Sequence, residues 1–148
     1  MSYALVTGAP RGIGRALALG LARRGYDLLL VARSADQLQA LADEARTRHK
    51  RQAQILALDL TLPTAAAEVA AWVAQQAPAG LAVLVNNAGY GLWGRFEQLG
   101  MAEQLNMLQL NLTLPVQLTH ALLPQLHRAP KAFILNVAST AAYQAVPR

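Results

Sequence analysis

The feature that most constrains the fold is a glycine-rich turn near the start of the chain, Thr7–Gly14, with the sequence TGAPRGIG. An apolar run, Tyr3–Val6, precedes the turn, and an amphipathic stretch, 15–22, follows it. A strand that passes through glycines into a helix directs backbone N–H groups and the positive end of the helix at one point. The turn therefore predicts a site for a phosphate or a pyrophosphate.

Each glycine of this turn has its own expected role. Gly8 permits a tight turn, Gly12 lets the backbone approach a ligand, and Gly14 lets the helix pack close to the strand. The spacing G-x-x-x-G-x-G differs from the common G-x-G-x-x-G. Any tight connection between a strand and a helix is the structural alternative, and the turn alone leaves both interpretations open.

Short apolar runs alternate with helical periods along all 148 residues, which is typical of βαβ units around a parallel sheet. The unbroken run Leu28–Val31 suits a parallel strand covered on both faces. The expected fold class is α/β, a doubly wound parallel sheet forming one domain over residues 1–148. The expected strands are 3–7, 27–32, 53–58, 81–85 and 132–137, and helices are expected at 12–24, after residue 34, at 64–76 and at 101–127.

Side-chain patterns predict how the helices start and what they bury. Ser34 is expected to cap the second helix, with Gln37 completing a capping box. The first helix is expected to bury Ile13, Leu17 and Leu21, and the second to bury Leu38, Leu41, Ala42 and Ala45. The 101–127 helix carries leucines nearly all round, so we expect it to be buried on several faces. A second copy of the chain is the simplest cover, which predicts a homo-oligomer formed through this helix.

A second motif, Asn86-Asn87-Ala88-Gly89, follows the fourth expected strand. Together with T-G-x-x-x-G-x-G at Thr7–Gly14, it resembles the hallmarks of the short-chain dehydrogenase/reductase family, over residues 3–147. The resemblance implies a Rossmann-type sheet and an oxidoreductase that interconverts a small-molecule carbonyl and an alcohol by hydride transfer. It implies cofactor contacts from Gly8, Arg11, Gly12, Ile13, Gly14, Asn86, Ala88 and Gly89, with Asn86 and Asn87 also stabilising the sheet.

The cofactor can be predicted from the end of the second strand. An NAD site wants a carboxylate there for the ribose 2′-OH, whereas this chain has Arg33, whose guanidinium can pair with a 2′-phosphate. Arg11 can add a second cation, so NADP(H) is preferred and NAD(H) is the second choice. Asp36 is the rival acidic residue, with an adequate role in the first turn of a helix. Asp59 and Leu60 match the family position that binds the adenine, and a turn or cap is the alternative for Asp59.

Two residues are expected to carry catalysis. Pro115 lacks an N–H, so the carbonyl of Asn111 loses its helical partner and can hold a water. The family uses an asparagine in this helix to hold a water in a proton relay. Ser139, at the end of the fifth strand, resembles the serine that hydrogen-bonds the substrate carbonyl. The alternatives are a polar residue bonded to a neighbour for Asn111 and a strand-end hydroxyl for Ser139.

The family's acid/base pair, Tyr-x-x-x-Lys, would fall beyond Arg148. Tyr143 has no lysine four residues later, and we expect it, with Tyr90 and Trp93, to border the substrate pocket instead. The chain is thus expected to be the N-terminal part of a reductase, inactive alone and with an uncovered fifth strand. A non-catalytic dinucleotide-binding module is the alternative function.

Composition narrows the remaining classes. The chain has a net charge of +5, no cysteine and no apolar run long enough to span a bilayer, and its first residues do not resemble a signal peptide. We therefore expect a cytoplasmic protein that binds neither membrane nor metal, since the three histidines lack metal-site spacing. The basic run Arg46–Arg51 suits a solvated helix end better than a nucleic-acid site, because no aromatic residues are interleaved with it.

Overall fold

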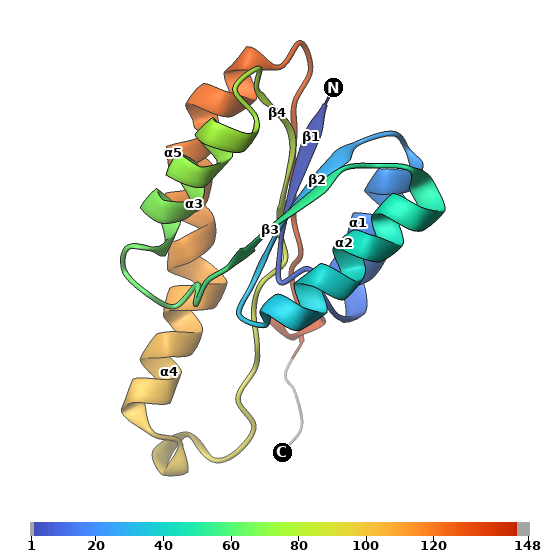
Figure 1. Ribbon diagram of the computed structural model, residues 1–148. Coiled ribbons are helices and arrows are strands. Elements are labelled where there is room, and N and C mark those ends of the chain that lie inside the picture. The colour runs from blue at the N-terminus through green and yellow to red at the C-terminus, as the bar shows by residue number, and fades with distance from the viewer. Residues whose placement is uncertain (1, 145–148) are drawn as a thin grey trace.

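A five-stranded parallel sheet with the strand order β3-β2-β1-β4-β5 is the centre of the fold in the computed structural model, which describes residues 2–144 (Figure 1). All five predicted strands are confirmed, with ends within one residue of those expected. The strands are β1 (Tyr3–Thr7), β2 (Asp27–Ala32), β3 (Ala53–Ala57), β4 (Leu81–Asn86) and β5 (Phe133–Asn136).

Helices cover both faces of the sheet, because successive side chains of a strand point to opposite sides. Ala4 and Val6 of β1 belong to the core on the side of α1 (Gly12–Arg23) and α2 (Ala35–His49). Leu5 belongs to the core beneath α3 (Ala65–Gln76) and α5 (Leu114–Arg128). Figure 1 shows these two helix pairs on either side of the sheet. The doubly wound α/β prediction is therefore confirmed.

The order of the strands reverses at β1. The chain builds outward from β1 to β2 and β3, then crosses to β4 and β5 on the other side of β1. The connections that follow β1 and β4 therefore leave the sheet in opposite directions. Ligands of open α/β sheets bind in the crevice that this reversal creates at the carboxyl ends of the strands.

The buried face of α1 differs from the predicted one. Gly14, Ala18 and Ala22 are buried, while Ile13 is 61% exposed and Leu17 is half-buried. Small residues let the helix axis approach the sheet closely, and a helix placed so close leaves its larger neighbours at the rim. The prediction assumed that α1 would bury its largest apolar side chains. The helix instead buries its smallest residues, because they allow the closest approach to the sheet.

The predicted capping box at the start of α2 is wrong. Ser34 is the N-cap residue, yet its side chain makes no cap hydrogen bond. The Oε1 atom of Gln37 instead accepts a hydrogen bond from Nε of Arg11, at 2.9 Å. Gln37 therefore bonds Arg11, which the tertiary fold brings near, and not the backbone of its own helix start. The predicted inner face of α2 is confirmed, since Leu38, Leu41, Ala42 and Ala45 are all buried.

The predicted 101–127 helix consists of three parts. α4 (Met101–Leu108) passes into a π-helical turn (Gln109–Thr113), and α5 follows with Pro115 in its first turn. A widened turn accommodates a proline that cannot donate to the preceding turn. Only one face of α5 is covered, by way of Leu114, Leu118, Leu122 and Leu126. Burial on several faces is therefore not found among the described residues, where Leu105, Leu108, Leu112 and Val116 are exposed.

The last strand is an open edge, as predicted. β5 pairs only with β4 among the described residues, and its apolar side chains stay exposed on both faces. The exposed fractions are 48% for Phe133, 44% for Ile134 and 43% for Leu135.

The basic run ends α2 and is largely engaged locally. Arg46 bonds Asp43 and the carbonyl of Ala53, and Arg48 bonds Glu44. These contacts agree with a solvated helix end. Within residues 2–144, no helix combines the length and apolarity that a bilayer crossing requires.

Two glycines of α1 provide a matched test of this packing. A Cβ on Gly14 would lie 2.3 Å from the carbonyl oxygen of Gly8, whereas on Gly20 its nearest neighbour is the flexible Arg24 guanidinium at 3.5 Å. We expect Gly14→Ala to lower the free energy of unfolding by about 2 kcal/mol or more. Gly20→Ala should raise it by about 0.5–1 kcal/mol. Urea unfolding measures both, and equal effects would contradict the close packing of α1.

Candidate active site

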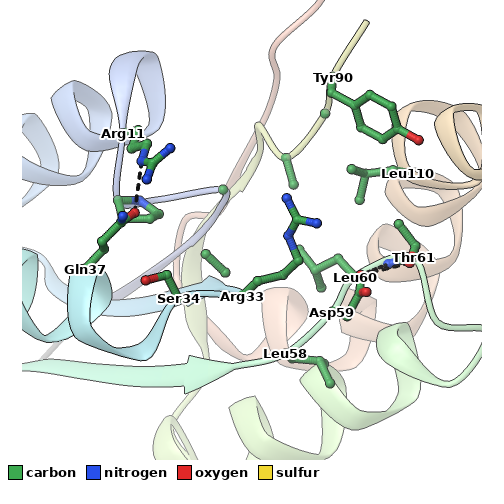
Figure 2. A pocket seen from close by; sticks show the side chains of 15 residues that line it. Arg11, Arg33, Ser34, Gln37, Leu58, Asp59, Leu60, Thr61, Tyr90 and Leu110 are labelled. Carbon is green, nitrogen blue, oxygen red and sulfur yellow. Dashed lines mark hydrogen bonds between the residues drawn. The ribbon is translucent and has the colours of Figure 1, made fainter. Parts of the chain in front are cut away.

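A cavity of about 370 Å³ opens at the carboxyl ends of β1, β2 and β3 (Figure 2). It brings together residues from the glycine turn, from the connection after β2, from the connection after β3 and from the segment after β4. Of the predicted cofactor-binding residues, its lining includes Gly8, Arg11, Arg33, Asp59, Leu60, Ala88 and Gly89.

A hydrogen-bond network joins the glycine turn to the segment after β4. Thr7 Oγ1 donates to the carbonyl of Val85 (3.2 Å) and accepts from the N–H groups of Asn87 (3.0 Å) and Ala88 (3.1 Å). The Asn87 side-chain amide donates to the carbonyls of Thr7 (2.9 Å) and Gly8 (3.1 Å). The two sequence motifs are therefore one unit in space.

Gly8 is required at this junction. Its φ is +63°, and a Cβ there would lie 2.9 Å from Cα of Ala88. Both the backbone conformation and the close approach exclude a side chain.

The start of α1 leaves backbone donors open. The N–H groups of Gly12, Ile13 and Gly14 donate to no acceptor within residues 2–144, and a Cβ on Gly12 would meet nothing within 4 Å. Three free N–H groups, the positive end of a helix and open space above Gly12 fit a pyrophosphate. These three residues lie beside the cavity and are not part of its lining.

The end of β2 presents a cation to the cavity and no carboxylate. Arg33 projects into the cavity and makes no hydrogen bond or ion pair with any other residue in the part of the chain described (Figure 2). Ser34 and Gln37 line the same end. Asp36, the rival acidic residue, is exposed and does not line the cavity.

Asp59 is held as a carboxylate beneath this site. Its Oδ1 accepts from the N–H (3.0 Å) and the hydroxyl (2.8 Å) of Thr61. The pKa of Asp59 is held below its usual range, mainly by the hydrogen bond from the Thr61 N–H and next by the one from the Thr61 hydroxyl. The nearby Arg33 guanidinium lowers this pKa further. Asp59 thus makes the turn contact that was the alternative to a cofactor role. It also lines the cavity.

A wider groove of about 1040 Å³ lies on the other side of the 88–90 segment, between α5 and the end of β5. Asn111 and Ser139 both line it, together with Asn86. The amide of Asn86 donates to Oδ1 of Asn136 (2.8 Å) and to Oγ1 of Thr119 (3.2 Å). Asn86 therefore ties β4 to β5 and α5, on the groove side and away from the first cavity.

The two candidate catalytic residues are held differently. The Asn111 side chain donates to the carbonyl of Tyr90 (2.8 Å) and accepts from its N–H (3.1 Å). The alternative for Asn111, a polar side chain bonded to a neighbour, is thus realised, while the water expected at its backbone carbonyl stays a prediction. Ser139 Oγ accepts from the N–H of Ala141 (3.1 Å), which leaves the hydroxyl hydrogen free to donate into the groove.

Aromatic residues near the groove divide into two groups. Tyr90 lines both cavities, as expected of a pocket residue. Tyr143 is 89% exposed, and neither it nor Trp93 lines either cavity, so those two expectations are wrong. Sequence reasoning missed Thr61 and Leu110 as lining residues, and no motif marks them. Residues 2–144 contain no cluster of metal-binding side chains.

Fold and site together define the class of protein: a Rossmann-type α/β domain with an anion-suited glycine turn at the reversal of its strand order. The sequence model of the family described as short chain dehydrogenase matches residues 2–148. The chain belongs to this family.

Individual relatives agree with this assignment. The chain is 31% identical to the very-long-chain 3-oxoacyl-CoA reductase-A of Danio rerio, over 98% of this chain and 46% of that protein. Among solved structures, an alcohol dehydrogenase from the archaeon Thermococcus sibiricus, complexed with 5-hydroxy-NADP, superposes with a TM-score of 0.91 at 33% identity, over 99% of this chain and 62% of that one. L-sorbose reductase from Gluconobacter frateurii, complexed with NADPH and L-sorbose, gives 0.92 at 28% identity, over 98% and 55%. The chain thus spans about half the length of the relatives it matches.

The Asp59 contacts predict a pH-dependent stability. A pKa lowered by folding stabilises the protein above the unfolded pKa of about 3.9, and this contribution is lost as the pH falls through the folded pKa. We expect Asp59→Asn to lower the free energy of unfolding by about 1 kcal/mol at pH 7. The difference from the wild type should shrink below about pH 4. Urea unfolding between pH 7 and pH 3 measures it, and a difference that does not change with pH would contradict the assignment. Thr61→Val, which keeps the shape but removes the hydroxyl, should give part of the same effect.

Proposed function

We propose that this chain forms the cofactor-binding part of an NADP(H)-dependent oxidoreductase that interconverts a carbonyl and an alcohol. The observation that carries the proposal is the cavity that Arg11 and Arg33 line beside the open N–H groups at the start of α1, with no carboxylate at the end of β2. Backbone donors suit the pyrophosphate, and a guanidinium suits a 2′-phosphate. The relatives named for bound NADPH or 5-hydroxy-NADP support this choice of cofactor.

The groove offers positions for the substrate. A nicotinamide dinucleotide, when bound, supplies or takes up the hydride. The free hydroxyl hydrogen of Ser139 can donate to a substrate carbonyl oxygen and hold it in place. Asn111 holds the 89–90 backbone between the two cavities, so that the wall facing both ligands keeps its shape. A ketone carbonyl, such as the 3-oxo group in the name of the 3-oxoacyl-CoA reductases, is the kind of group that this arrangement would bind.

A proton donor for the carbonyl is the part of this chemistry that the described residues do not supply. No lysine lines the groove within residues 2–144, and the hydroxyl of Tyr90 donates to the carbonyl of Glu103 (3.2 Å). The family resemblance assigns proton transfer to a Tyr-x-x-x-Lys pair, which the described residues do not contain. The lack of a lysine in the groove favours a second candidate, a non-catalytic dinucleotide-binding module.

The exposed apolar side of α4 and α5 supports a further part of the proposal, self-association. Leu105, Leu108, Leu112 and Val116 form an uncovered apolar stripe there, and its Leu112 and Val116 end also borders the groove. Monomeric proteins seldom expose such a surface, so we propose that a second copy covers it. The cytoplasmic location expected from the cysteine-free sequence stays a prediction.

Oxidation of NADPH with a panel of ketones tests the activity. We expect no turnover by the chain itself, and turnover by a version extended through a downstream Tyr-x-x-x-Lys. Ser139→Ala in the extended version should lower kcat by about 100-fold or more, with cofactor affinity unchanged. Absence of turnover in both versions, with NADPH still bound, would favour the binding module.

The cofactor preference has a separate test. We expect Arg33→Asp to weaken NADPH binding by about 100-fold and to favour NADH, because a carboxylate repels the 2′-phosphate and accepts from the ribose hydroxyls. Cofactor fluorescence titrations give both dissociation constants. Arg24→Asp, an exposed change at the far end of α1, is the control for net charge. Unchanged relative affinity for the two cofactors would refute the role of Arg33.

A further inference from the structure

One contact at the cavity has no part in the capping of α2. Gln37 lies in the first turn of α2, yet its Oε1 accepts from Nε of Arg11 (2.9 Å), a residue 26 positions earlier in the glycine turn. Both side chains line the first cavity, and Figure 2 shows the bond between them. The contact therefore spans two of the segments that form the cavity.

The bond determines how Arg11 presents its charge. A guanidinium is planar, so a hydrogen bond at Nε restricts the orientation of the whole group. Nη1 and Nη2 of Arg11 make no hydrogen bond or ion pair with any residue between 2 and 144. These two nitrogens form a fork that can bind two oxygens of one phosphate.

The acceptor is neutral, and this distinguishes the contact from the other bridge between α1 and α2. Arg15 pairs with the carboxylate of Glu44, which cancels its charge. Gln37 holds Arg11 without cancelling the charge, so the arginine stays fully available to an anion. Arg33 lines the same cavity, and a phosphate monoester carries nearly two negative charges at neutral pH.

We propose that Gln37 is a positioning residue that orients Arg11 toward the 2′-phosphate of the bound dinucleotide, and that it thereby contributes to the preference for NADP(H). This inference rests on the proposed function. The pyrophosphate is assigned to the open N–H groups of Gly12, Ile13 and Gly14, so the Arg11 fork serves the ribose end. A solvent-exposed bond of this kind contributes little to folding, so its loss should appear in binding and not in stability.

The test compares NADPH with NADH, which differ only in the 2′-phosphate. Gln37→Met keeps the length and the helix propensity of the side chain and removes the acceptor. We expect it to raise the Kd for NADPH by about threefold to tenfold, the effect of one lost hydrogen bond, with the Kd for NADH and the melting temperature unchanged. Gln37→Glu should weaken NADPH binding further, because a carboxylate neutralises Arg11 and repels the phosphate. Gln39→Met, an exposed change in the same helix, is the matched control.

A double-mutant cycle shows whether Gln37 acts through Arg11. In an Arg11→Met background, Gln37→Met should have no further effect on the Kd for NADPH. Equal losses for NADPH and NADH, or an undiminished effect in that background, would overturn the inference while leaving the proposed function intact. A wild-type chain that binds neither dinucleotide, or both equally, would overturn the NADP(H) proposal and this inference together.

Discussion

The interaction on which the site depends is the network between Thr7 and Asn87. One hydroxyl and one amide join the carboxyl ends of β1 and β4, the two strands between which the chain changes direction. These bonds extend the pairing of β1 with β4 beyond the ends of the strands, where Gly8 lies close to Ala88. Each group in the network is satisfied, which is why it can be buried.

The network also divides the polar groups of the turn between structure and ligand. The Asn87 amide donates to the carbonyls of Thr7 and Gly8, so these two acceptors of the turn are used within the protein. The N–H groups at the start of α1 stay open, and they all favour negative charge. Arg33 and the Arg11 fork lie at the same cavity, and the local field therefore selects an anionic ligand.

A short backbone segment separates the cavity from the groove. Ala88, Gly89 and Tyr90 form a wall that both share, and Asn111 holds this wall through the backbone of Tyr90. A Cβ on Gly89 would lie 2.9 Å from Oδ1 of Asn111, so the glycine of the second motif serves this contact. The π-helical turn that contains Asn111 is thus where the long helix adapts to the site.

The sequence by itself determined the five strands, the doubly wound class and the position of the glycine turn, because periodicity and glycine spacing are properties of short segments. It also placed about half of the cavity lining, since parallel strands bring their carboxyl ends to one edge. Only the tertiary structure decided that α1 buries Ala18 and Ala22 instead of Ile13, that Gln37 meets Arg11, and that Asn111 meets Tyr90. The two residues of each pair lie 26 and 21 positions apart in the chain. A polar side chain can bond several neighbours in sequence, and only the packing of the fold brings a distant partner within hydrogen-bond distance.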